Sequence, residues 1–206
     1  MGGRIVHMAM ENPDVVLAGA FERGDHGAVG RDAGEVAGLG VVGVPVAGSP
    51  EEVGGPGDVL IDFTSPEATL ANARIAAEKG WSLVIGTTGL SGERLEALRE
   101  LAAGLRCVMA PNMSVGVNLM FRIASEMARV LGDDYDMEIL ETHHRFKKDA
   151  PSGTDLRLAQ VLAEAVGRDL DKTAVYERRG MIGERTRDEI GRSEERRVGK
   201  ECATGC

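Results

Sequence analysis

Apolar residues along the chain occur in two arrangements, as short unbroken runs and as longer stretches in which they recur every three or four positions. Short aliphatic runs bounded by glycine, proline or acidic residues are typical of buried strands, and the longer spacing is typical of amphipathic helices. The runs predict strands at 15–20, 59–63, 82–85, 106–110 and 137–140, and residues 169–176 lead into another strand. The periodic stretches predict helices at 2–10, 66–79, 92–102, 117–131 and 154–166.

Strands and helices alternate through the first half of the chain, which favours a parallel sheet with right-handed crossovers. The helix at 2–10, the strand at 15–20 and the acidic Glu22 follow the order of the second half of a dinucleotide-binding unit. The glycine–threonine turn at 86–89 follows a strand, at the position where open α/β sheets bind ligands. The pattern therefore predicts an α/β fold of the Rossmann type whose first strand is missing.

The composition argues against several classes of partner. The 206 residues carry a formal net charge of −9, which disfavours nucleic acid or an anionic membrane. No stretch is apolar for long enough to span a bilayer. The three cysteines fit a reducing compartment better than a disulfide scaffold. The acidic run 133–136 lacks the glycine and glutamate spacing of a calcium loop, so no metal site is predicted.

The stretch 141–154 carries most of the candidate chemistry. It holds two imidazoles and three basic side chains, which are His143, His144, Arg145, Lys147 and Lys148. A predicted strand precedes it, and a predicted helix follows with Thr154 as its N-cap. Backbone N–H groups at a helix start attract anions, and histidines exchange protons near neutral pH. The stretch therefore predicts a site that holds and protonates a small anion, although a solvated basic loop would have the same residue types.

The run His143-His144-Arg145, followed by Lys147 and by Asp149 to Thr154, closely resembles the signature of the 4-hydroxy-tetrahydrodipicolinate reductase (dihydrodipicolinate reductase) family. The resemblance implies an oxidoreductase of the diaminopimelate route to lysine, which uses NADH or NADPH to reduce a cyclic imine with two carboxylates. It implies that His143 is the acid–base residue and Lys147 the proton donor. It also implies substrate contacts at His144, Gly153 and Thr154.

The same resemblance implies a set of cofactor contacts in the first half. Glu22 and Arg23 would lie at the ribose, where Glu favours the free 2′-hydroxyl of NAD and Arg the 2′-phosphate of NADP, so either cofactor is expected. Met1-Gly2 resembles the last residues of the family's glycine loop, which makes Met1 an expected internal methionine of a longer chain. Further contacts are implied at Phe63, Thr64, Gly86, Thr87 and Thr88, and in a second loop at Ala110, Pro111, Asn112 and Met113.

The resemblance extends over residues 1–191 and sets the expected domains. Residues 1–114 would form the dinucleotide-binding domain, and residues 115–191 part of a smaller α+β substrate domain with a mixed sheet. Residues 192–206 resemble translated linker or sequencing-adapter sequence, so we expect them to lie outside the fold. The family further implies a cytoplasmic homotetramer.

Two other interpretations remain open from the residues alone. The first half would suit another two-domain NAD(P)-dependent reductase of a small anionic substrate, and the contiguous run at 143–154 argues against that interpretation. The other is an inactive nucleotide-binding fragment or sensor, which the missing glycine loop favours for the chain as written.

Overall fold

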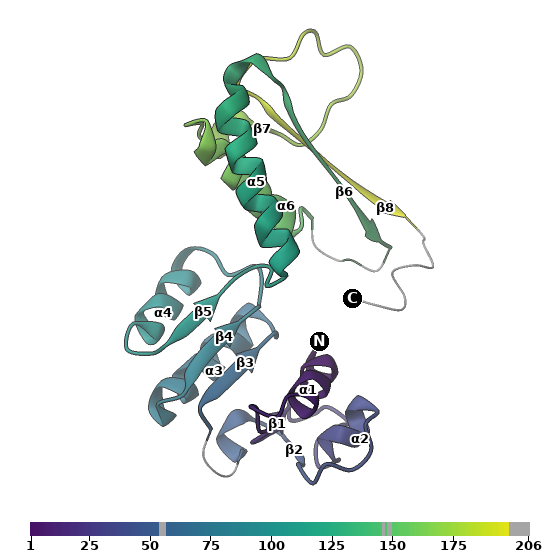
Figure 1. The fold of residues 1–206 in the computed structure, drawn as a ribbon, viewed down its shortest axis with the longest axis vertical. Coiled ribbons are helices and arrows are strands. Elements are labelled where there is room, and N and C mark those ends of the chain that lie inside the picture. The colour runs from purple at the N-terminus through teal and green to yellow at the C-terminus, as the bar shows by residue number, and fades with distance from the viewer. Residues whose placement is uncertain (54–56, 146, 148–149, 198–206) are drawn as a thin grey trace. The chain divides into compact units, whose positions relative to one another are not determined.

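The computed structural model describes residues 1–53, 57–145, 147 and 150–197, and the chain divides into two units between Ala110 and Pro111. The first unit contains α1 (Gly2–Glu11), β1 (Ala20–Phe21), α2 (Ala33–Ala37), β2 (Val46–Ala47), η1 (Pro50–Glu52), β3 (Val59–Asp62), α3 (Pro66–Lys79), β4 (Ser82–Ile85), α4 (Gly92–Ala102) and β5 (Cys107–Met109). The second contains α5 (Val115–Leu131), η2 (Gly132–Asp134), β6 (Met137–His144), α6 (Gly153–Ala165), α7 (Leu170–Thr173), β7 (Ala174–Val175) and β8 (Ile190–Arg197) (Figure 1). The division lies four residues before the boundary expected from the sequence.

The first unit is built on the parallel sheet β3–β4–β5, which confirms the predicted Rossmann-type arrangement. Its core contains Leu60, Leu83, Ile85 and Leu98, which are buried between the sheet and the helices. Helix α3 begins where predicted because the Ser65 hydroxyl accepts a hydrogen bond from the Ala68 N–H. It ends at Gly80, whose φ of 68° lies in the left-handed region that glycine tolerates.

Strand β1 is shorter than the predicted strand at 15–20. Only Ala20 and Phe21 pair, in parallel register with Val46 and Ala47 of β2. Within the described residues the preceding valines have no strand partner, and Val16 is 86% exposed. An aliphatic run forms a strand only where a neighbouring backbone takes up its hydrogen bonds. Phe21 nevertheless packs against the core of the three-stranded sheet, so the end of β1 lies beside that sheet.

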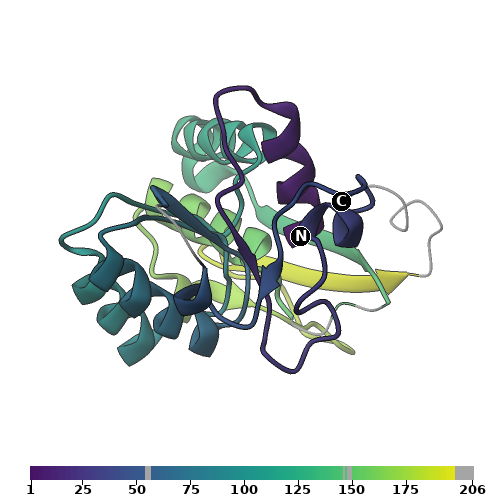
Figure 2. The same cartoon turned by 90° about the horizontal axis from the view of Figure 1, so that it is seen from below.

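The second unit places α6 against α5 and against the sheet β6–β8–β7, in which β8 lies between the other two strands (Figure 1, Figure 2). Both pairings are parallel, which differs from the mixed sheet expected from the sequence. Parallel neighbours need long connections, and here α6, α7 and β7 lie between β6 and β8, while residues 176–189 connect β7 to β8. The core consists of Ile139, Ala159, Ala163 and Ile190. Among the described helices, none is both long and apolar enough to cross a membrane.

Strand β8 includes residues 192–197, although the sequence placed everything after 191 outside the fold. Ile190 is fully buried, and Arg192 is 4% exposed. Because side chains alternate along a strand, Ile190 and Arg192 share one face. The charged run gave no apolar pattern from which a strand could be predicted, and the buried arginine is accommodated by pairing with Asp155.

Candidate active site

The two adjacent histidines of β6 lie on opposite faces of the sheet. Side chains along the strand alternate between partly buried and exposed, and His143 shares the inner face with Ile139 and Glu141. His144 lies on the other face and is exposed. The predicted acid–base residue His143 and the predicted substrate contact His144 are adjacent in sequence, but their side chains lie on opposite faces of the sheet.

Glu141 is the centre of a hydrogen-bonded cluster that was not predicted from the sequence. Its carboxylate oxygen Oε2 lies 2.7 Å from Nε2 of His143. Oε1 accepts the Ser152 N–H at 2.8 Å, and Oε2 also accepts the Ser152 hydroxyl. A single carboxylate thus connects the imidazole to the residue that starts α6. The i, i+2 spacing of Glu141 and His143 could have indicated it only if the predicted strand 137–140 had been continued to residue 144, where β6 ends.

The carboxyl group of Glu141 is ionised at neutral pH. Burial by itself would raise its pKa, but the hydrogen bonds from the Ser152 hydroxyl, the Ser152 N–H and His143 outweigh that effect. The net result is a pKa below the ordinary value of 4.5. A negatively charged Glu141 accepts the proton of Nε2, which leaves Nδ1 of His143 for exchange with another molecule.

Helix α6 has its N-cap two residues earlier than predicted, at Ser152 rather than Thr154. The Ser152 hydroxyl accepts the Asp155 N–H at 3.1 Å, while its own backbone is extended. A cap of this kind contributes about 1 kcal/mol to helix stability. Gly153 and Thr154 are therefore the first two helical residues, where backbone N–H groups have no acceptor within the helix. Two of the three predicted substrate contacts consequently lie at a helix start that favours an anion, and the third, His144, lies at the end of β6.

Thr154 is bonded to a residue of the predicted second cofactor loop. The Asn112 amide donates to the Thr154 hydroxyl at 3.1 Å. Asn112 also accepts the Ser114 N–H at 2.9 Å, and its carbonyl accepts the Asn118 amide at 3.0 Å. These bonds hold Asn112 between the starts of α5 and α6. Its neighbours Pro111 and Met113 are exposed.

Lys147, the predicted proton donor, lies three residues after the end of β6. Its N–H donates to the His144 carbonyl at 3.2 Å, and the residue is partly buried. Arg145 is exposed at the turn between them. The signature residues Lys148 and Asp149 lie outside the residues that the structure describes.

Asp155 places a carboxylate near the same helix start, and Arg192 neutralises it. The guanidinium Nε donates to Oδ2 at 2.9 Å, and both side chains are almost fully buried. Tyr176 binds the same guanidinium through its hydroxyl at 2.9 Å. The charge of Asp155 therefore opposes an anion at Gly153 and Thr154 less than the sequence alone would indicate.

The predicted cofactor residues of the first unit lie at strand ends, except Met1, which is the N-cap of α1. Glu22 and Arg23 follow β1 and are exposed, and Arg23 forms an exposed ion pair with Asp25. Such a pair is weak and can yield to a phosphate. Met1 is 70% exposed and accepts the N–H groups of Arg4 and Ile5 through its carbonyl.

The second group follows the ends of β3, β4 and β5. Thr64 and Thr88 are exposed, whereas Thr87 is only 7% exposed and binds other side chains. Thr87 can offer a ligand its backbone but not a free hydroxyl. Ala110 continues β5, and its N–H donates to the Ile85 carbonyl at 3.1 Å.

The lowered pKa of Glu141 predicts a pH-dependent contribution to stability. A group whose pKa is lower in the folded chain stabilises it fully above the unfolded pKa, and this stabilisation is lost as the pH falls through the folded pKa. We expect Glu141→Gln to lower the Tm by a few degrees at pH 7, and the difference from wild type to narrow as the pH falls below the ordinary glutamate pKa of 4.5.

Thermal unfolding followed by circular dichroism between pH 3 and pH 7 measures this difference. Glu126→Gln is a matched control, because Glu126 pairs with Arg129 on an exposed helix face. The control should differ little from wild type at every pH. A Tm difference for Glu141→Gln that stays constant between pH 7 and pH 3 would contradict the expected role of its carboxylate.

Comparison with known proteins gives one consistent result. Residues 1–113 match the family model described as dihydrodipicolinate reductase, N-terminus, and residues 116–203 match its C-terminus. The chain is 50% identical to the 4-hydroxy-tetrahydrodipicolinate reductase of Syntrophus aciditrophicus and 52% identical to that of Desulfotalea psychrophila. Each match covers 93% of this chain and 71% of the relative. A solved structure, dipicolinate-bound dihydrodipicolinate reductase from Paenisporosarcina sp. TG-14, is 28% identical with a TM-score of 0.64, covering 94% of this chain and 73% of that one.

Proposed function

The chain belongs to the dihydrodipicolinate reductase family, and on that premise we propose that His143 and Lys147 carry the proton transfers of its reaction. It is an NAD(P)H-dependent oxidoreductase that reduces 4-hydroxy-tetrahydrodipicolinate to tetrahydrodipicolinate, with loss of water, in the diaminopimelate route to lysine. The substrate is a cyclic imine that bears two carboxylates. The protein must therefore bind two negative charges and supply a proton.

The proposal rests on the hydrogen bonds that the Glu141 carboxylate makes to two different residues. This carboxylate binds His143 on one side and the N-cap of α6 on the other. The same carboxylate therefore holds the imidazole of His143, which can accept and donate a proton, and the start of α6, which attracts anions. The Asn112–Thr154 bond ties the loop proposed to lie near the nicotinamide to that helix start.

The residues then have distinct tasks. N–H groups of Gly153 and Thr154 bind one substrate carboxylate, and His144 adds a contact to the substrate. Glu141 holds His143 by Nε2, so proton exchange with the substrate takes place at Nδ1. Lys147 donates the proton that the reduced ring requires. The dipicolinate named for the structural neighbour is itself a dicarboxylate, which supports a site of this kind.

The residues of the first unit fit a nicotinamide cofactor. The carboxyl ends of parallel strands β3, β4 and β5 lie along one edge, where α/β sheets bind dinucleotides. Gly86 lies so close to the Phe63 ring that a Cβ at Gly86 would come within 2.0 Å of it, so only glycine lets this turn approach. When bound, reduced nicotinamide supplies the hydride. The proposed cofactor contacts of the first unit are Met1, Glu22, Arg23, Gly86, Thr87, Thr88 and Ala110, and those of the second unit are Pro111, Asn112 and Met113.

The decisive experiment is a nicotinamide oxidation assay on this chain. Freshly generated 4-hydroxy-tetrahydrodipicolinate is mixed with NADH or NADPH, and absorbance at the wavelength of the reduced cofactor is followed. We expect substrate-dependent oxidation with either cofactor. Cofactor binding without oxidation would instead support a nucleotide-binding module, and oxidation with another small anion but not this one would support a different reductase.

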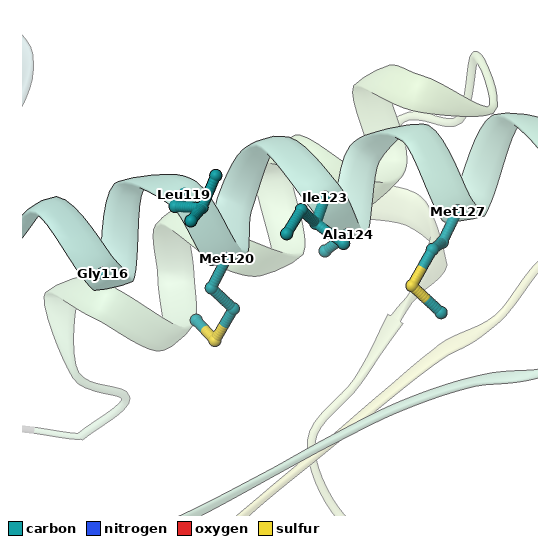
Figure 3. A pocket seen from close by; sticks show the side chains of 6 residues that line it. All are labelled: Gly116, Leu119, Met120, Ile123, Ala124 and Met127. Atoms are coloured by element: carbon teal, nitrogen blue, oxygen red, sulfur yellow. The ribbon is translucent and has the colours of Figure 1, made fainter.

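We also propose that the protein is a cytoplasmic homotetramer, as the family resemblance implies. One side of α5 supports association, because it exposes the apolar residues Leu119, Met120, Ile123 and Met127 by 43–56%. With Gly116 and Ala124 they line an open hollow of about 320 Å³ (Figure 3). Exposed apolar patches of this kind mark interaction sites.

Light scattering coupled to size-exclusion chromatography measures the assembly. We expect a mass four times the 21.8 kDa of one chain, and Ile123→Glu should lower it. Glu126→Lys, a charge reversal on the same helix outside the hollow, should leave the mass unchanged. A monomer at tens of micromolar protein would contradict the proposed tetramer.

A further inference from the structure

Asp62 is a buried carboxyl group at the end of β3 that the proposed reaction does not use. It is 1% exposed, and five polar groups surround it. Its Oδ1 accepts the Thr64 N–H at 2.9 Å and the Thr64 hydroxyl at 2.6 Å. The Thr69 and Thr87 hydroxyls each lie 3.2 Å from Oδ1, and Oδ2 accepts the Asn72 amide at 2.8 Å.

The hydroxyl protons can be assigned by counting, because each hydroxyl has only one proton to donate. Thr69 lies 2.8 Å from the Thr87 oxygen and 3.2 Å from Asp62, so its better acceptor is Thr87. Thr87 then donates to Asp62, and its oxygen also accepts the Thr64 N–H at 3.0 Å. Hydrogen bonds therefore run from Thr69 of α3 to Thr87, and from Thr87 to Asp62. They connect the loop after β3 with the loop after β4.

Two further contacts hold the same loops together. The Gly86 N–H donates to the Asp62 carbonyl at 2.8 Å, which joins β4 to β3 at their last residues. The Phe63 ring lies against Gly86 with no room for a Cβ. The loop that follows Asp62 and the loop that follows Ile85 are therefore held in fixed positions relative to each other by these contacts.

We propose that Asp62 is a positioning residue for cofactor binding, which acts by holding the loops 63–66 and 86–89 in register at the carboxyl edge of the sheet. It does not touch the cofactor, because its side chain is buried and occupied by protein donors. This inference rests on the proposed cofactor site for its functional consequence, but the ordering of the loops is a property of the free chain. The acceptor is required because Thr64, Thr87 and Asn72 donate directly to this buried carboxylate, and the Thr87 hydroxyl in turn accepts from Thr69.

The test compares Asp62→Ala with wild type in two measurements. Amide hydrogen exchange of the full chain without cofactor reports the order of loops 63–66 and 86–89, and quenching or enhancement of NADH fluorescence reports binding. We expect exchange in both loops to rise about tenfold, and the Kd for NADH to rise about tenfold with it. Thr87→Val removes one donor with little change in shape, and should loosen loop 86–89 about threefold.

Ile75→Ala is the matched control. Ile75 is 8% exposed and lies in α3, the helix that also contains Thr69 and Asn72, and its side chain makes no polar contact. It should lower the Tm while leaving loop exchange and the Kd for NADH within about twofold of wild type. Unchanged exchange in both loops of Asp62→Ala and Thr87→Val, or a rise no larger than in Ile75→Ala, would overturn the role of Asp62. Failure of wild type to bind NADH would overturn the proposed cofactor site instead, so the two failures are distinguishable.

Discussion

Replacing His143 with glutamine is expected to lower kcat for 4-hydroxy-tetrahydrodipicolinate reduction by about 100-fold or more, as for the loss of a general acid–base group. Glutamine can keep a hydrogen bond to Glu141, so the strand and the start of α6 should remain in place. What it loses is an imidazole nitrogen that can both accept and donate a proton. Steady-state kinetics with saturating NADH, together with the Tm, separate the lost chemistry from a folding defect.

His7→Gln is the matched control for this variant. His7 lies on α1 and bonds the Ala37 carbonyl at 2.9 Å, away from every proposed catalytic group in sequence. Its turnover should stay close to that of wild type. Near-normal turnover in His143→Gln, with an unchanged Tm, would remove His143 from the proton-transfer role.

For Lys147→Ala we expect kcat to fall by about 100-fold, with a smaller rise in the KM for the substrate. An interaction that acts only in the transition state lowers kcat, whereas one that binds substrate and transition state equally raises KM alone. The proposed task of Lys147 is to donate a proton to the ring, which belongs to the first kind. Initial rates across a range of substrate concentrations give both constants.

Lys172→Ala provides the comparison for loss of a lysine charge. Lys172 is an exposed lysine paired with Asp169 at 2.8 Å on α7, and we expect its removal to change neither constant. An increase in KM for Lys147→Ala with kcat preserved would make Lys147 a binding residue and leave His143 as the proposed proton-transfer group.

Local patterns predicted the elements whose stabilising contacts lie close in sequence. Helix α3 is an example, because its cap, its first-turn proline and its terminal glycine are all read from residues 65–80. The parallel sheet β3–β4–β5 followed equally from the alternation of strands and helices. The run at 143–154 indicated the family through its residue types alone, and the comparisons confirmed the family.

Errors arose where a partner distant in sequence determines the outcome. The helix start moved to Ser152 because its hydroxyl and N–H also bind Glu141, eleven residues earlier. Of the run at 15–20 only Ala20 lies in a strand, which continues to Phe21 and pairs with the backbone of β2. Arg192 is buried because Asp155, 37 residues away, supplies its counter-charge.

By itself, then, the sequence determined the fold class, the reductase family and the stretch that carries the candidate chemistry, because apolar periodicity and contiguous residue types are local properties. Only the tertiary structure decided which of those residues share a site. It separated His143 from His144 through the alternation of a strand, and joined His143 to Ser152 through Glu141. It also gathered Asp62, Thr69 and Thr87 from three elements, since buried polar groups are satisfied by whichever donors the packing brings together.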